Sequence, residues 1–203
     1  MGRKIGIMGG TFNPIHIGHL MLAEHAYEEF SLDEVIFLPS ARPPHKDQQI
    51  LSDINRKEMI LLATQDNPHF SFSSLEFERK GTTYTVDTMR ELNKRYPKDT
   101  FYFIIGADSF FALESWYNPK ELFRQTSFVV ATRDGHKKEE LEKHKNTLEQ
   151  QYQAKIQFLN SPNIEISSRS IRKRVLEGKS ISYYVPKAVE EYINRHRLYL
   201  SER

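Results

Sequence analysis

The sequence contains no cysteine among its 203 residues. Disulfide bonds, a thiol nucleophile and a cysteine zinc site are therefore excluded, and the composition fits a reducing compartment. The sequence also lacks any apolar run long enough to span a bilayer. Only Met1 to Met8 precede the first motif, which leaves no room for a signal peptide. We expect a soluble, cytoplasmic protein with no membrane partner.

Neither sign of charge is in large excess. The 29 lysines and arginines against 27 acidic residues give a formal net charge of +2, and the pI is about 8.6. This balance is too weak to indicate nucleic acid as the main partner. The basic residues do cluster at Arg169, Arg172, Lys173 and Arg174. A solvated helix face explains such a cluster about as well as an anion site does.

Short strand-like runs alternate along the chain with stretches of helical periodicity. The expected strands cover residues 5–8, 35–38, 101–105, 128–131 and 156–159, and the expected helices cover 18–30, 53–66, 85–96, 119–124, 138–152, 169–177 and 186–196. This alternation predicts an α/β fold, a Rossmann-like doubly wound parallel sheet with helices on both faces. We expect one domain over residues 1–203, with a small C-terminal helical subdomain from about residue 163.

The most informative stretch is GGTFNPIHIGH, from Gly9 to His19, between the first expected strand and helix. Gly9 and Gly10 permit a sharp turn that brings amide donors against a ligand. Gly18 at the helix start would leave room for a phosphate beside unpaired amides. His16 and His19 lie three residues apart and can face the same volume. The pattern predicts a phosphate-binding loop, with an ordinary turn and surface histidines as the alternative.

Two common nucleotide loops are excluded. Met8 and Thr11 stand where the dinucleotide fingerprint needs its second and third glycines, and Lys173 stands where a Walker loop ending at Ser180 needs its first. The stretch instead resembles the T/HxGH motif of the nucleotidyltransferase superfamily, and its wording is similar to that of nicotinate mononucleotide adenylyltransferases. Because HIGH also occurs in class I aminoacyl-tRNA synthetases, the other motifs must decide.

Four further polar clusters follow expected strands or open expected helices. Residues 39–46 form a proline-rich loop with Arg42, His45 and Lys46; residues 81–85 are GTTYT; residues 106–117 hold Asp108 and Trp116; and residues 166–172 are ISSRSIR. Three of them have a structural alternative: a surface loop for 39–46, a core aromatic for Trp116 and a plain helix cap for residues 166–172.

The resemblance implies a role for each of these positions. It places ATP at Gly9, Gly10, Thr11, Phe12, His16, His19, Gly106, Asp108, Ser167, Ser168 and Arg172. It places the mononucleotide at Lys46, Thr83, Tyr84, Asp108, Trp116, Tyr117 and Arg133, with His45 a weaker candidate. His16, His19, Lys46 and Arg172 would be the catalytic residues, with the ISSxxIR motif corresponding to the KMSKS loop of the synthetases.

The implied reaction is adenylyl transfer from ATP to nicotinate mononucleotide, which gives nicotinate adenine dinucleotide and pyrophosphate. Mg²⁺ would enter on the ATP phosphates, with no protein metal ligands. A homodimer is compatible with this interpretation, and no nucleic-acid partner is expected. Two alternatives stay open: a sister enzyme that uses nicotinamide mononucleotide, phosphopantetheine or glycerol phosphate, and a non-catalytic nucleotide- or tRNA-binding module.

Overall fold

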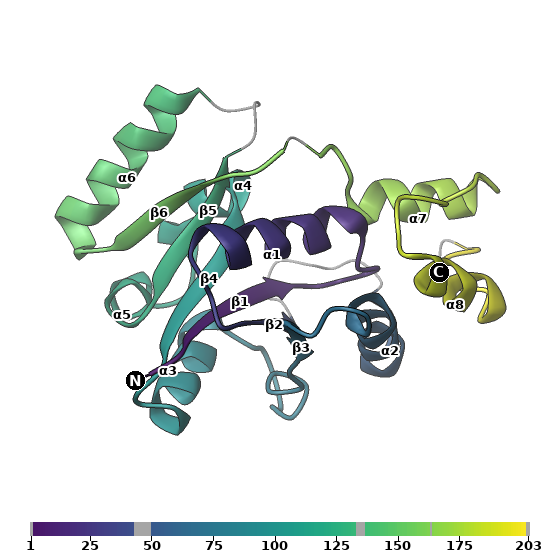
Figure 1. The fold of residues 1–203 in the computed structure, drawn as a ribbon, viewed down its shortest axis with the longest axis horizontal. Helices are drawn as coiled ribbons and strands as arrows, with labels where there is room; N and C mark the ends of the chain where they lie inside the picture. The colour runs from purple at the N-terminus through teal and green to yellow at the C-terminus, as the bar shows by residue number, and fades with distance from the viewer. Residues whose placement is uncertain (1, 43–49, 133–136, 163, 202–203) are drawn as a thin grey trace.

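The computed structural model describes residues 2–42, 50–132, 137–162 and 164–201. In these residues one parallel sheet has the order β3-β2-β1-β4-β5-β6 (Figure 1). The strands are β1 (Lys4–Gly10), β2 (Glu34–Pro39), β3 (Phe70–Phe72), β4 (Thr100–Gly106), β5 (Ser127–Thr132) and β6 (Lys155–Asn160). This order confirms the predicted doubly wound α/β fold.

Strand β3 was not predicted from the sequence. This strand has only three residues and lies at the edge of the sheet, where it pairs with β2 through Val35 and Phe70. A run of three residues is too short to show the alternation that marks a strand.

The seven predicted helices are present within about two residues of their expected ends. They are α1 (Ile17–Glu29), α2 (Asp53–Thr64), α3 (Thr85–Arg95), α5 (Pro119–Gln125), α6 (Lys138–Tyr152), α7 (Ser168–Leu176) and α8 (Lys187–Arg195). The predicted cap of α2 is confirmed, since Ser52 Oγ accepts from the Asn55 amide at 3.3 Å. Two short elements were missed, α4 (Ala107–Phe111) and the 3₁₀ turn η1 (Leu113–Ser115).

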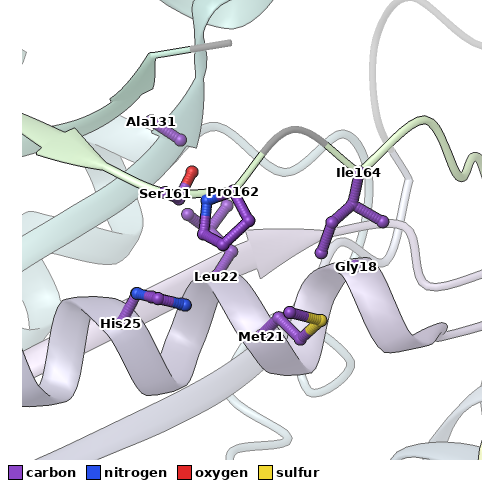
Figure 2. Close-up of a pocket in the computed structure, with 8 residues that line it drawn as sticks. All are labelled: Gly18, Met21, Leu22, His25, Ala131, Ser161, Pro162 and Ile164. Atoms are coloured by element: carbon purple, nitrogen blue, oxygen red, sulfur yellow. The ribbon is translucent and has the colours of Figure 1, made fainter.

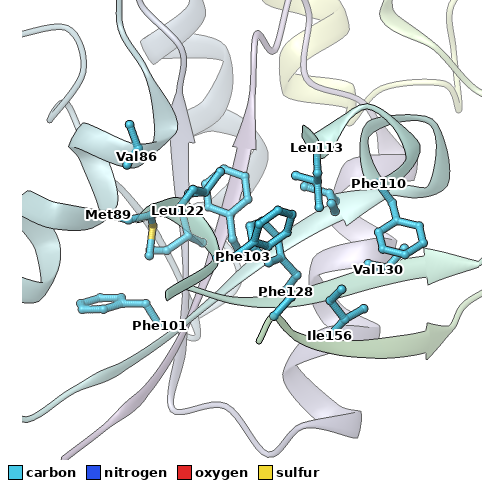
Figure 3. Close-up of a cluster of buried hydrophobic side chains, with 14 of the residues drawn as sticks. Val86, Met89, Phe101, Phe103, Phe110, Leu113, Leu122, Phe128, Val130 and Ile156 are labelled. Atoms are coloured by element: carbon cyan, nitrogen blue, oxygen red, sulfur yellow. The ribbon is translucent and has the colours of Figure 1, made fainter. Parts of the chain in front are cut away.

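Helices cover both faces of the sheet, and each face has its own hydrophobic cluster. One cluster lies under α3, α4, α5 and α6 and contains Phe103 and Phe128 (Figure 3). The other lies under α1, α2, α7 and α8 and contains Ile104 and Val129. Adjacent residues of β4 and β5 thus point to opposite faces, as strands buried on both sides require.

The central strands β1 and β4 are neighbours, and each leads directly into a helix at its carboxyl end. Helix α1 follows β1 on one face, and α4 follows β4 on the other. The strand order reverses here, at the position where open α/β sheets bind ligands. No helix in the described ranges is long and apolar enough to cross a membrane.

Candidate active site

The GGTFNPIHIGH stretch links β1 to α1, but its glycines act differently from the prediction. Gly9 and Gly10 are extended and pair with β2. A Cβ at Gly9 would lie 2.5 Å from Phe103 Cζ, and one at Gly10 would lie 3.1 Å from the Phe12 ring. The turn itself falls at Phe12, whose φ is +48°. The predicted sharp turn at the glycines was therefore wrong: they make room for two aromatic rings.

His16 and His19 lie together where α1 begins. Their rings stack with centroids 3.6 Å apart and planes 22° apart. The His16 amide donates to His19 Nδ1 at 3.3 Å. Because Nδ1 is the acceptor, neutral His19 carries its proton on Nε2 and can present that proton to a ligand.

Gly18 serves the same pair. A Cβ at this position would lie 3.1 Å from His16 Nδ1. His16 itself is only 4% exposed. The absence of a side chain at Gly18 thus leaves room for the His16 ring, and a phosphate beside Gly18 stays a prediction.

Helix α7 is bound to the Asn13–Pro14 segment of this loop. Ser168 Oγ donates to the Pro14 carbonyl at 2.7 Å, and Arg172 Nη1 donates to the Asn13 carbonyl at 2.8 Å. Ser167 caps the helix by accepting from the Ser170 amide at 3.1 Å. The fold therefore brings the ISSRSIR segment to the Asn13–Pro14 part of the loop that precedes His16, across more than 150 residues of sequence.

The other cations of the basic cluster have different surroundings. Lys173 pairs with Glu177 at 3.7 Å. Arg174 donates to the Ser180 carbonyl at 2.8 Å and lies over the Tyr184 ring. The structure thus separates Arg172, which contacts the motif loop, from its two neighbours.

Buried Arg56 was not predicted. Its side chain is 1% exposed and donates to the carbonyls of Thr11 at 3.0 Å and Leu51 at 3.2 Å. It also donates to the Ser40 carbonyl and pairs with Asp53. Burial lowers the pKa of the Arg56 guanidinium. An arginine on an amphipathic helix is ordinarily expected to be exposed, so no local signal marks it.

On the opposite face, the expected acceptor residues form an aromatic group. The Tyr84 and Tyr117 rings lie 4.3 Å apart, and Tyr117 is 58% exposed. Half-buried Trp116 sits edge-on to Phe103 at 6.2 Å and 87°. Phe103 is also the ring against Gly9, so it supports both halves of the site.

Thr83 is buried and bound to Arg42. Its amide donates to the Arg42 carbonyl and its Oγ1 accepts from the Arg42 amide, both at 3.4 Å. The Thr83 amide is thus engaged within the protein. Tyr84 is the N-cap of α3, and the first-turn amides of that helix follow it.

Asp108 lies in the first turn of α4, exposed beside the end of β4. Gly106, the last residue of β4, faces open space, since a Cβ there would have no atom within 4 Å. Lys46, His45 and Arg133 fall outside the described residues. Among the residues that the structure does describe, no group of three His, Asp or Glu side chains is arranged to hold a metal ion.

A pocket open to the solvent lies beside the start of α1 (Figure 2). It is lined by Gly18, Met21, Leu22, His25, Ala131, Ser161, Pro162 and Ile164. These residues come from α1, from β5 and from the segment after β6. Apart from Gly18, none of them was predicted as a site residue, because they meet only in the fold.

Comparison with known proteins gives matches over nearly the whole chain. A family model described as cytidylyltransferase-like matches residues 7–174. A probable nicotinate-nucleotide adenylyltransferase of Lachnoclostridium phytofermentans is 50% identical over 199 residues, which cover 98% of this chain and 100% of that protein. One of Exiguobacterium sibiricum is 43% identical over 196 residues, 97% of this chain and 98% of that protein.

The fold is shared with solved structures. The nicotinic acid mononucleotide adenylyltransferase of Plasmodium falciparum, complexed with NaAD, has a TM-score of 0.82 at 22% identity, with 97% of each chain covered. The family model over residues 7–174 and these relatives place the chain in the cytidylyltransferase-like class of nucleotidyltransferases. Within that class, the chain belongs to the nicotinate-nucleotide adenylyltransferase family, which confirms the resemblance carried by GGTFNPIHIGH.

Proposed function

We propose that the protein transfers the adenylyl group of ATP to nicotinate mononucleotide, forming nicotinate adenine dinucleotide and pyrophosphate. The observation that carries this proposal is the Arg172–Asn13 contact, which joins the basic start of α7 to the loop bearing His16 and His19. Imidazole and guanidinium donors then converge where a triphosphate would carry its charge. Trp116 and Tyr117 lie on the other face of the sheet, where they would form a separate binding region for the mononucleotide.

The acceptor phosphate attacks the α-phosphorus of ATP. A new P–O bond forms, the bond from the α-phosphorus to the bridging oxygen breaks, and pyrophosphate leaves with the electron pair. A phosphate monoester has a second pKa of about 6, so it is largely dianionic at neutral pH and needs no general base. The protein's part is to position the reactants and stabilise charge.

We assign that stabilisation to His19 and Arg172. His19 carries its proton on Nε2 because its Nδ1 accepts from the His16 amide. The Nε2–H group is therefore the hydrogen-bond donor that we assign to the ATP phosphates. Arg172 is held by the Asn13 carbonyl and would bind the departing phosphates. Mg²⁺ would arrive with ATP and share the charge of its phosphates.

Adenine would occupy the pocket beside Gly18, where Met21, Leu22 and Ile164 offer apolar surface for a flat base. Asp108 would accept hydrogen bonds from a ribose. Trp116 and Tyr117 would contact the nicotinate ring, and the amides at the start of α3 would bind its carboxylate. Lys46 and Arg133 remain predicted phosphate contacts. The cytoplasm, as a source of ATP, is the compartment that this proposal implies.

Pyrophosphate release tests the proposal. The protein is mixed with ATP and Mg²⁺ and with one of four acceptors: nicotinate mononucleotide, nicotinamide mononucleotide, phosphopantetheine or glycerol phosphate. We expect release chiefly with the first. Release chiefly with another acceptor would identify a sister enzyme, and release with none would favour a non-catalytic binding module.

A further inference from the structure

Tyr199, in the segment after α8, contacts the motif loop directly. Its hydroxyl donates to Asn13 Oδ1 at 2.8 Å, across 186 residues of sequence. Burial raises the pKa of this hydroxyl well above its usual range, so it stays a protonated donor at neutral pH. The segment after the last helix thus reaches the loop on which the proposed ATP site depends.

Asn13 joins several parts of that site. Its Oδ1 also accepts from the Leu51 amide at 3.4 Å, and its carbonyl accepts from Arg172 at 2.8 Å. The next carbonyl, that of Pro14, accepts from Ser168 at 2.7 Å. A shift of the Asn13 side chain would therefore disturb the backbone that seats both α7 residues.

The backbone around Tyr199 has an unusual conformation. Arg197 and Tyr199 have φ values of +51° and +64°, in the left-handed region that residues other than glycine rarely adopt. Between them, Leu198 is buried and its amide donates to the Ile193 carbonyl at 3.0 Å. Such conformations persist only where surrounding contacts fix them. The segment after α8 is thus held in the bend that delivers the Tyr199 hydroxyl to Asn13.

We propose that Tyr199 is a positioning residue for the adenylyl-transfer site: its hydroxyl fixes Asn13, and Asn13 fixes the carbonyls on which Arg172 and Ser168 rest. This inference depends on the proposed function for its kinetic consequence only. Tyr199 contacts no reacting atom in this scheme. Its loss should misplace Arg172 when charge develops on pyrophosphate, which lowers kcat and leaves acceptor binding on the opposite face intact.

Tyr199→Phe removes the hydroxyl, and Tyr192→Phe is its matched control. Tyr192 lies on α8 and donates to Asn55 Oδ1 at 2.9 Å, away from the motif loop. We expect Tyr199→Phe to lower kcat about threefold to tenfold, the equivalent of one hydrogen bond. The KM for nicotinate mononucleotide should stay within about twofold of the parent. Tyr192→Phe should change neither constant.

A double-mutant cycle tests whether Tyr199 acts through Asn13. Asn13→Ala removes the acceptor side chain, and we expect it also to lower kcat at least about threefold. In that background Tyr199→Phe should have almost no further effect, because its partner is already gone. If Tyr199→Phe does not fold, Asn13→Ala tests the proposal by itself. A kcat of Asn13→Ala equal to that of the parent would overturn the proposal.

Hydrogen–deuterium exchange gives a readout that needs no turnover. Amides of residues 11–20 should exchange faster in Tyr199→Phe than in the parent, and at the parental rate in Tyr192→Phe. Equal kinetic losses in both tyrosine variants, additive losses in the cycle, or unchanged kcat and exchange in Tyr199→Phe would each overturn the proposal. A parent that releases no pyrophosphate would refute the proposed function instead, while the exchange comparison would still test the Tyr199 contact.

Discussion

The imidazole rings of His16 and His19 stack at the start of α1, and the His16 amide donates to His19 Nδ1. This bond fixes which His19 nitrogen carries the proton. It also separates two properties of His19: Nδ1 supports the helix start, and Nε2 bears the proton that the proposed reaction uses. Substitutions at position 19 can therefore test catalysis apart from folding.

His19→Ala should lower kcat by about 10²-fold or more, because a donor directed at developing charge is worth about 3 kcal/mol. His19→Asn can keep an acceptor for the His16 amide but lacks a donor at the Nε2 position, so we expect a parental fold and the same kinetic loss. Steady-state kinetics and circular dichroism measure the two effects. Glu28→Ala, on the exposed side of the same helix, is the control. Turnover of His19→Ala within about threefold of the parent would contradict the assignment.

Trp116→Ala should chiefly raise the KM for nicotinate mononucleotide, since stacking on an aromatic face is worth about 1–3 kcal/mol. The KM for ATP should be almost unchanged. Because Trp116 also packs on Phe103, Trp116→Phe is the control that keeps an aromatic ring there. The chain has a single tryptophan, so quenching of its fluorescence by the mononucleotide gives an independent titration. Equal effects on both substrates would mean that Trp116 is only a core residue.

Nicotinate mononucleotide should be preferred over its amide by at least about tenfold in kcat/KM. A carboxylate at the start of α3 gains charge-assisted bonds worth about 1.5–3 kcal/mol, and an amide would place donor against donor. With the Thr83 amide bound to Arg42, we assign this contact to Tyr84 and the amides that follow it. Specificity constants at equal Mg²⁺·ATP measure the preference. A ratio of specificity constants near one would contradict the proposed carboxylate-binding site.

Arg56→Ala should lower the free energy of unfolding by about 3–5 kcal/mol, because buried carbonyls and Asp53 lose their partner. Urea denaturation measures this loss. Arg195→Ala, at an exposed position of α8, should change stability by less than about 0.5 kcal/mol. A similar small change in Arg56→Ala would show that the Arg56 contacts do not hold the Thr11 and Leu51 segments together.

The stability difference between the parent and Tyr199→Phe should depend on pH. Burial raises the pKa of Tyr199 in the folded protein above the unfolded value of about 10. The contribution of the Tyr199 hydroxyl to the free energy of unfolding is therefore fully present below pH about 10 and is lost as the pH rises further. We expect the difference in unfolding free energy to shrink by about 1 kcal/mol between pH about 8 and about 11. A constant difference would contradict burial of this hydroxyl.

The sequence by itself determined the alternation of strands and helices and the position of the nucleotide loop. These features are local: hydrophobic periodicity and cap residues such as Ser52 lie within a few positions of the structure they specify. Strand β3 and helix α4 were missed for the same reason, since three and five residues are too few to show a period. The roles of Lys46 and Arg133 stay predictions.

Only the tertiary structure decided what surrounds the loop. The Phe103 ring lies against Gly9, which is part of an extended strand where the sequence had predicted a turn. The tertiary structure also showed that Asn13 receives Tyr199 and that buried Arg56 holds the neighbouring carbonyls. The Arg56–Thr11 contact joins segments 45 residues apart, and the Asn13–Tyr199 contact joins segments 186 residues apart. No local pattern encodes them, because each side chain finds its partner only after the sheet has brought distant strand ends to one edge.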